Sequence, residues 1–144
     1  MNNELYHYGV LGMKWGVRRY QNKDGSLTRA GQKRHNKYLE ETEQRAKGWK
    51  SAAKKSFDTA NKIRSMSDKE YVKKTYDDDD YVKLLGGASK VKAKDIKYYE
   101  TKASDYARYA KDWSKAHDAL MNTPMSQLQT KKDYKKLIRS YLNG

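Results

Sequence analysis

The sequence contains no cysteine, and it has only one proline and one phenylalanine among its 144 residues. The absence of cysteine excludes disulfide bonds, zinc sites built on thiolates and thiol nucleophiles. No apolar run approaches the roughly 20 residues that a membrane-spanning helix needs, and the N-terminus lacks the apolar region of a secretory signal. We therefore expect a soluble protein that is intracellular when made.

Apolar bulk is also scarce. Hydrophobic residues make up 36% of the chain and charged residues 35%, and the aromatic residues are mostly tyrosine. A chain of this length can form one compact domain or one helical hairpin with appendages, but not two large domains. Its core must be thin and partly polar, built from Tyr, Trp, Ala and a few branched aliphatic residues.

Positive charge is present in large excess, with 32 Lys and Arg against 18 Asp and Glu and a formal net charge of +14. Bases outnumber acids by 11 to 4 in residues 28–65 and by 13 to 6 in residues 89–144, whereas residues 66–88 hold 4 bases and 6 acids. Such a balance favours attraction to polyanions or to an acidic protein surface.

Residues that could perform catalysis are few. The three histidines, His7, His35 and His117, lack the spacing of a metal site on one helix face. We expect His117 to pack between helices with one nitrogen hydrogen-bonded, and His35 to be solvated. The acidic run Asp77–Asp80 lacks the glycine turn of a calcium loop and is interpreted as a solvated loop. No phosphate-binding loop or Ser/His/Asp grouping stands out, so we expect no enzyme, metal site or cofactor.

A first long helix is predicted over residues 28–65, capped by Thr28. Its apolar and small residues recur every seven positions in two interleaved series, with Phe57 beside them. The two series are Leu39, Ala46, Ala53, Ala60 and Thr42, Trp49, Ser56, Ile63. Gly48 falls on the outer face, where it costs about 1 kcal/mol relative to alanine.

A second long helix is predicted over about 89–121, ended by Thr123 and Pro124. It repeats the pattern over four heptads, with Ile96, Ala103, Ala110, His117 in one series and Tyr99, Tyr106, Trp113, Leu120 in the other. We expect an all-α fold in which the two helices form a long antiparallel hairpin, alanines of one facing aromatic rings of the other. The same alanine-rich seams would also allow a homodimer.

Short helices are predicted around this hairpin. Ser67 and Glu70 form a capping box for a helix to about residue 76, and Asp80 is expected to cap a turn that ends at Gly86 and Gly87. A last amphipathic helix begins near Thr130. Its apolar stripe could pack on the hairpin, dock on a partner helix or lie on an anionic surface, and its other face carries Lys131, Lys132, Lys135, Lys136 and Arg139.

The basic residues of the two long helices, with Tyr and Trp between them, are the candidate polyanion-binding site. Several such charges together can neutralise phosphates and release counterions, although any single lysine is more simply a solvated residue. The candidates are Lys50, Lys54, Lys55, Lys62 and Arg64 on the first helix and Lys102, Arg108, Lys111 and Lys115 on the second.

The N-terminal segment follows no helical pattern. Residues 7–21 read HYGVLGMKWGVRRYQ, followed by NKDGSLT at 22–28 and by Gly31. This segment resembles an N-terminal motif of proteins encoded by tailed bacteriophages and prophages of Gram-positive bacteria, where it precedes otherwise different bodies, several of them virion or head-associated. The resemblance covers about 25 residues, and residues 36–144 resemble no family. It implies a phage origin.

Two interpretations of residues 1–27 remain open, beside a basic helical domain at 28–144. In one, the segment recognises a partner, because glycines let the backbone lie close to a surface while aromatic and basic side chains grip it. The residues expected to do so are Met13, Lys14, Trp15, Arg18, Arg19 and Tyr20. In the other, the segment wraps the hairpin and completes its core. In both, residues 22–25 form a turn into the first helix.

Three functional hypotheses follow. The first is a non-enzymatic phage accessory protein, virion or head-associated, whose basic helices contact nucleic acid or an acidic assembly surface. The second is a phage inhibitor of bacterial defence, similar to an anti-CRISPR protein, that binds an effector or its nucleic acid. An enzyme is the least favoured. The expected location is the host bacterial cytoplasm or the virion.

Overall fold

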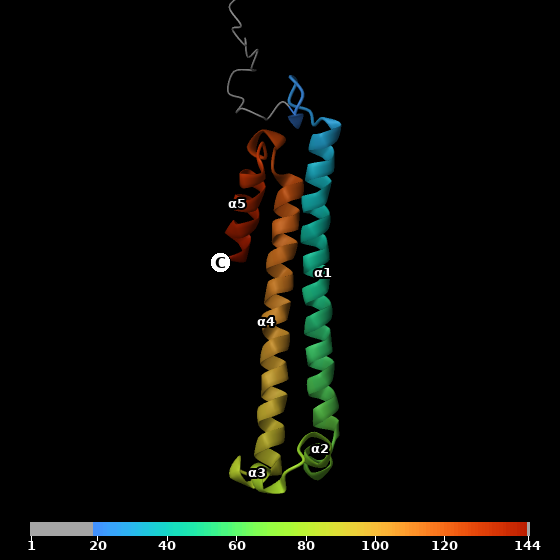
Figure 1. Cartoon of the computed structure of the whole chain (residues 1–144), viewed down its shortest axis with the longest axis vertical. Coiled ribbons are helices and arrows are strands. Elements are labelled where there is room, and N and C mark those ends of the chain that lie inside the picture. Colours follow the sequence, from blue (N-terminus) through green and yellow to red (C-terminus); the bar gives the residue numbers. More distant parts are fainter. Residues whose placement is uncertain (1–18, 144) are drawn as a thin grey trace, which may run out of the picture. The chain divides into compact units, whose positions relative to one another are not determined.

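The structure is a computed structural model that describes residues 19–143, and this part of the chain is helical (Figure 1). The α-helices are α1 (Arg29–Ser65), α2 (Asp68–Thr75), α3 (Asp79–Leu84), α4 (Ala88–Asn122) and α5 (Lys131–Leu142), with a 3-10 turn η2 (Met125–Gln127) before α5. The predicted all-α fold is confirmed, and the predicted bounds of the two long helices lie within a residue of those observed. The 3-10 turn was not predicted.

The chain divides into two compact units that share the long helices. Among the described residues, unit 1 contains 19–43 and 113–143, and unit 2 contains Gln44–Asp112. In each unit, the segments of α1 and α4 run side by side in opposite directions, as the heptad pattern predicted (Figure 1). None of the sixteen predicted seam residues is exposed. The alanine-rich seams are therefore closed within the chain.

Unit 1 has three layers of helix at its centre, because α5 packs on the segments of α1 and α4. Tyr134 and Ile138 of α5 are buried in one cluster with Ala116 and Leu120 of α4 and with Leu128. Tyr134 is 0% exposed and stacks on Tyr38 at 4.6 Å between ring centroids. Of the three roles open to the C-terminal helix, packing on its own chain is the one observed.

Polar contacts join the helices of unit 1. The Nδ1–H of His117 donates to the carbonyl oxygen of Leu39 at 3.0 Å, and this nitrogen lies 3.0 Å from the Thr42 hydroxyl, so the prediction for His117 is confirmed. The prediction that His35 is solvated is wrong. Its Nδ1 lies 3.1 Å from the Tyr134 hydroxyl, and partial burial lowers the pKa of His35.

Unit 2 has two layers along most of its length. Trp49 of α1 contacts Tyr106 and Tyr109 of α4, each at 5.2 Å between ring centroids. No residue in 44–55 or 92–112 is fully buried, and the buried residues of α1 begin again with Ser56. The main core of the unit lies at the connector, where Tyr71 and Val72 of α2 and Val82 of α3 pack with Ile63 and Val91.

The connector helices are set by their caps. The Ser67 hydroxyl accepts from the Glu70 amide, as predicted. The cap of α3 is Asp78 and not Asp80, since a carboxylate oxygen of Asp78 accepts from the amides of Asp80 and Tyr81. The prediction chose the last aspartate of the run. In the structure, Asp79 and Asp80 occupy the first turn of α3, where the helix dipole favours negative charge.

Candidate polyanion interface

Unit 2 contains every predicted polyanion-binding residue except Lys115, which belongs to unit 1. The predicted residues do not form one stripe. Residues three and four positions apart share one side of a helix, so the spacing divides them between two sides of the α1 and α4 pair. We call these two sides the basic face and the mixed face.

The basic face is a row of exposed residues on each helix. The α1 row is Lys47, Lys50, Lys54, Phe57, Asn61 and Arg64, and the α4 row is Lys97, Glu100, Ser104, Ala107 and Lys111. Both rows step by three and four residues, and Arg64 joins them through an ion pair with Glu100. The face holds six basic residues and one acidic residue. The structure therefore brings together four of the predicted residues and adds Lys47 and Lys97.

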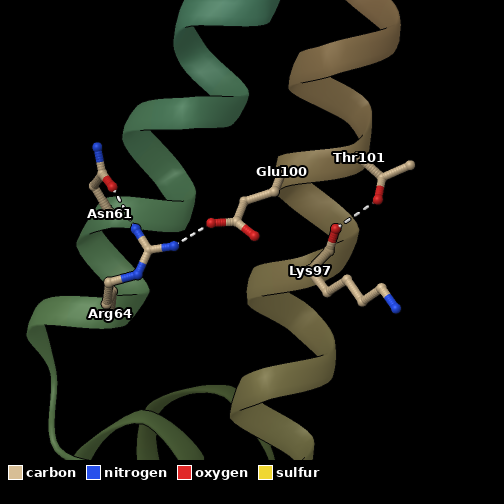
Figure 2. Close-up of polar contacts among 5 residues, drawn as sticks. All are labelled: Asn61, Arg64, Lys97, Glu100 and Thr101. Atoms are coloured by element: carbon tan, nitrogen blue, oxygen red, sulfur yellow. Dashed lines mark hydrogen bonds and ion pairs between the residues drawn. The ribbon is translucent and has the colours of Figure 1, made fainter.

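The only carboxylate of the basic face is already paired. Figure 2 shows Arg64 reaching from α1 to Glu100 on α4, while its other terminal nitrogen donates to Asn61 Oδ1 at 2.6 Å. Within the part of the chain that the structure describes, no ion pair involves Lys50, Lys54 or Lys111. These ammonium groups remain open to an external anion.

Phe57 adds an apolar element to the basic face. The sequence placed it beside the seam, and the structure leaves the residue 53% exposed. Lysines precede it by three and by seven positions in the same row. An exposed aromatic ring among ammonium groups is the combination used by proteins that stack on unpaired bases.

The mixed face lies on the other side of the seam. Its α1 row is Arg45, Gly48, Ala52, Lys55, Thr59 and Lys62, and its α4 row is Asp95, Tyr98, Lys102, Asp105, Tyr109 and Asp112. Three acids nearly balance its four bases. The Nζ of Lys102 lies 4.6 Å from the Tyr98 ring centroid, and the hydrogen bond that this ammonium donates to the Tyr98 hydroxyl oxygen raises its pKa. The predicted residues Lys55, Lys62 and Lys102 belong here, and Arg108 pairs with Asp105 at 3.5 Å.

Of the predicted residues in the N-terminal motif, Met13, Lys14, Trp15 and Arg18 lie outside the described residues. Arg19 and Tyr20 lie inside them and are held by α1. The Thr28 hydroxyl donates to the Arg19 carbonyl at 2.7 Å, and the Thr28 amide donates to the Tyr20 carbonyl at 3.0 Å. The guanidinium of Arg34 lies 3.7 Å from the Tyr20 ring centroid. The ring of Tyr20 is therefore engaged within the chain.

Gly31 and Gln21 complete this anchor, which we define as residues 19–31. A Cβ on Gly31 would lie 2.0 Å from the Tyr20 carbonyl oxygen, so only glycine fits there. Gln21 is 4% exposed and donates from Nε2 to the Met125 carbonyl at 2.8 Å. Residues 22–25 form the predicted turn, with the Gly25 amide bonded to the Asn22 carbonyl at 3.0 Å and Gly25 at a φ of 85°. This part of the motif is a packed element.

The connector contains a polar cluster that the sequence did not indicate. The hydroxyls of Tyr71 and Tyr76 both donate to one oxygen of Asp95, at 2.6 and 2.8 Å. Burial, followed by the hydrogen bond to Asp95, raises the pKa of Tyr71, and the same causes raise the pKa of Tyr76 to about 12. Both hydroxyls stay protonated and tie α2 and the following loop to α4.

Within residues 19–143, no group of three or more His, Asp or Glu side chains is arranged to hold a metal ion. No helix in the same range is both long and apolar enough to cross a bilayer.

The described residues thus form a basic helical protein built on two long helices, with residues 19–31 packed against them. Comparison with known proteins adds one match: residues 1–22 fit the model of a family of unknown function, DUF7211. No curated protein and no solved structure matches the chain. The family match overlaps the first part of the segment singled out by its sequence, and it ends at the residue after Gln21.

Proposed function

We propose that this chain is a non-enzymatic, phage-encoded accessory protein whose basic face binds nucleic acid. The observation that carries the proposal is the basic face of unit 2, where six basic residues lie exposed with one acidic residue that is already paired. Phosphates are the partner that such a surface attracts most strongly, because each neutralised phosphate releases condensed counterions.

The exposed ring of Phe57 favours single-stranded nucleic acid over a duplex. In a duplex the bases are stacked on each other, whereas an unpaired base offers its face to an aromatic side chain. The two helices present lysines on both sides of this ring, from α1 and from α4. A single-stranded nucleic acid whose phosphates contact these lysines would place a base near Phe57.

The phage assignment rests on the N-terminal motif. The resemblance to phage and prophage proteins lies in residues 7–31, and the family match covers residues 1–22. In this proposal, the part of the motif before residue 19 joins the protein to a virion or head assembly. The same basic face would also suit an inhibitor that binds the nucleic acid of a bacterial defence effector.

The direct test is binding of a fluorescent single strand by anisotropy over a range of salt. If the five lysines of the basic face contact phosphates, affinity falls about 100-fold between about 50 and about 200 mM salt. A duplex of the same length should bind more weakly at equal salt. Affinity that does not change with salt, or binding only to an acidic protein, would contradict the proposal.

Mass spectrometry of purified phage particles separates the two phage roles. The chain should be present in particles if it is virion or head-associated. Absence from particles, together with expression early in infection, would favour the inhibitor of bacterial defence. In that case, purification of the chain from infected cells should recover an effector.

A further inference from the structure

We propose that the mixed face of unit 2 binds the mixed face of a second copy of the chain, giving a homodimer with four helices side by side. This proposal does not depend on the proposed binding of nucleic acid by the basic face. It rests on three features of the mixed face: partly exposed aromatic rings, a charge pattern that complements itself, and a glycine that packing among the described residues does not require.

The first feature is incomplete burial. In unit 1, α5 covers the α1 and α4 segments, and the resulting cluster holds five residues that are at most 8% exposed. In unit 2, Tyr98 is 52% exposed and Tyr109 is 39% exposed, although both belong to the row that flanks the seam. Tyr38, which stacks under α5, holds the same heptad position as Arg45 of the mixed face. Unit 2 lacks a third layer at this position, and a second copy would supply one.

The second feature is the separation of charge between the two rows. The acids of the mixed face are all on α4, and the bases are on α1 apart from Lys102. Asp95 is occupied by two tyrosine hydroxyls, whereas Asp105 makes a 3.5 Å pair with the exposed Arg108 on its own helix, so Asp105 and Asp112 are the acids that could face another surface. A surface with bases along one row and acids along the other pairs with a copy of itself when the rows are exchanged.

The register of the hairpin makes this exchange fit. Trp49 lies against Tyr106, and further along the pair the Met66 carbonyl accepts from Lys92. Measured along the helix axis, these contacts place each base of the α1 row at about the same height as an acid of the α4 row, to within about one helical turn. A two-fold axis parallel to the helices keeps every residue at its own level. It therefore sets α1 bases of one copy opposite α4 acids of the other.

The perpendicular two-fold axis is disfavoured by the same charges. It would place the α1 row of one copy antiparallel to the α1 row of the other, where the bases Arg45, Lys55 and Lys62 of one copy repel those of the other. The charge pattern thus selects one symmetry. In that symmetry, Lys55 of each copy lies near Asp105 of the other, in competition with the local pair between Asp105 and Arg108.

The third feature is Gly48, which lies inside α1 on the mixed face. A Cβ added there would have no heavy atom within 4 Å, so packing within the described chain does not require glycine. Glycine weakens a helix interior and is used where another surface approaches closely. In the proposed dimer, Tyr109 of the partner lies level with Trp49 and comes over Gly48 and Ala52. The large exposed rings of one row meet the small residues of the other.

The size of the contact predicts a weak, reversible dimer. The α1 row from Arg45 to Lys62 is about 25 Å long, and two helices side by side are about 20 Å wide, so each copy offers about 500 Å². A total near 1,000 Å² is at the lower limit of specific interfaces. We expect a dissociation constant in the micromolar range.

Sedimentation equilibrium of the full chain tests the proposal against the monomer mass of 16.8 kDa. The wild-type chain should shift from monomer to dimer between about 1 and about 300 µM, as expected for a micromolar constant. Gly48→Gln should weaken dimerisation at least about tenfold while raising the melting temperature of the dilute protein, because glutamine favours helix. Ser51→Gln, on the outer side of α1, is the matched control and should leave the dimer unchanged.

Charge exchange gives a second, independent readout. Lys55→Asp and Asp105→Lys should each weaken dimerisation several-fold, and the double variant should recover most of the loss. Three results would each overturn the proposal. The first is that Gly48→Gln dimerises as well as the Ser51→Gln control, and the second is that the double variant dimerises more weakly than either single variant. The third is that the wild-type chain remains monomeric at about 300 µM.

Discussion

The two units use the same pair of long helices in different ways. In unit 1, a third helix and the anchor cover the pair, and Leu120, Leu128 and Tyr134 are at most 1% exposed. In unit 2, the pair is left with two long faces in solvent, one strongly basic and one of mixed charge. Under the proposed function, the covered helix pair of unit 1 serves stability, whereas the two exposed faces of unit 2 serve binding. Substitutions in one unit should therefore change a property that matched substitutions in the other do not.

The largest expected effect is on stability and comes from the core of unit 1. Leu120→Ala should cost about 3 kcal/mol of unfolding free energy, since the residue is 0% exposed and truncation leaves a cavity. Its neighbour Met121 is 63% exposed, and Met121→Ala should cost less than about 0.5 kcal/mol. Urea unfolding followed by circular dichroism measures both. Equal losses from the two variants would contradict the assignment of the core.

Two glycines should respond in opposite directions to the same change. Gly31→Ala should cost about 2 kcal/mol, because the new methyl group meets the Tyr20 carbonyl and displaces the anchor. Gly48→Ala should stabilise the dilute protein by up to about 1 kcal/mol, since nothing in the described chain opposes the methyl group. Thermal unfolding at low concentration compares them. A Gly31→Ala variant as stable as wild type would mean that the anchor does not hold.

A smaller effect is expected at Phe57 of the basic face. Phe57→Ala should lower affinity for a single strand about fivefold, the lower end of the effect of losing one stacked base. Affinity for a duplex should change little, and so should stability, because the residue is 53% exposed. The matched control is Tyr98→Ala on the mixed face, because Tyr98 is 52% exposed. This substitution should not affect single-strand binding by the dilute protein. An equal loss for strand and duplex would argue against stacking.

The smallest effect is a difference in pH dependence. Burial lowers the pKa of His35 in the folded state, so the unfolded chain takes up a proton on this residue more readily than the folded chain does. The stability that neutral His35 contributes is therefore present above about pH 6.5, and it declines as the pH falls below that value. We expect a melting temperature lower by about one or two degrees at pH 5.5 than at pH 7.5, and a smaller change in His35→Gln. Unit 2 contains no histidine, so strand affinity should vary little from pH 6.5 to 8. A pH-dependent affinity in that range would break the comparison.

The helical part of the fold follows closely from sequence because its signals are local. Heptad spacing correctly predicts that α1 and α4 pack on each other through their seam residues. The capping residues Thr28, Ser67 and Thr130 correctly predict where three helices begin. The cap of α3 was misplaced because four adjacent aspartates offer equivalent side chains. The environment of His35 was missed because its partner Tyr134 lies 99 residues away, and no local pattern records such a contact.

The candidate site follows from the sequence only in part, because the net charge of a helix does not say on which side of the helix each charge lies. Spacing by three and four residues separates Lys50 and Lys54 from Lys55 and Lys62, and this information was present in the sequence. The ion pair of Arg64 with Glu100 needed the structure, since it depends on how α1 and α4 are aligned. So did the role of Gly31, which is set by a carbonyl eleven residues earlier in the chain.

In the proposed function, the position of the charges, and not only their sum, lets unit 2 bind nucleic acid. Two double variants test it, Lys50→Glu with Lys54→Glu on the basic face and Lys55→Glu with Lys62→Glu on the mixed face. Each lowers the formal net charge from +14 by four. Both are measured by anisotropy titration of a nucleic-acid single strand at nanomolar protein. The basic-face variant should lose about 100-fold in affinity, and its slope of log affinity against log salt should fall by about two. The mixed-face variant should lose less than about threefold in affinity. Equal losses in the two variants would contradict the claim.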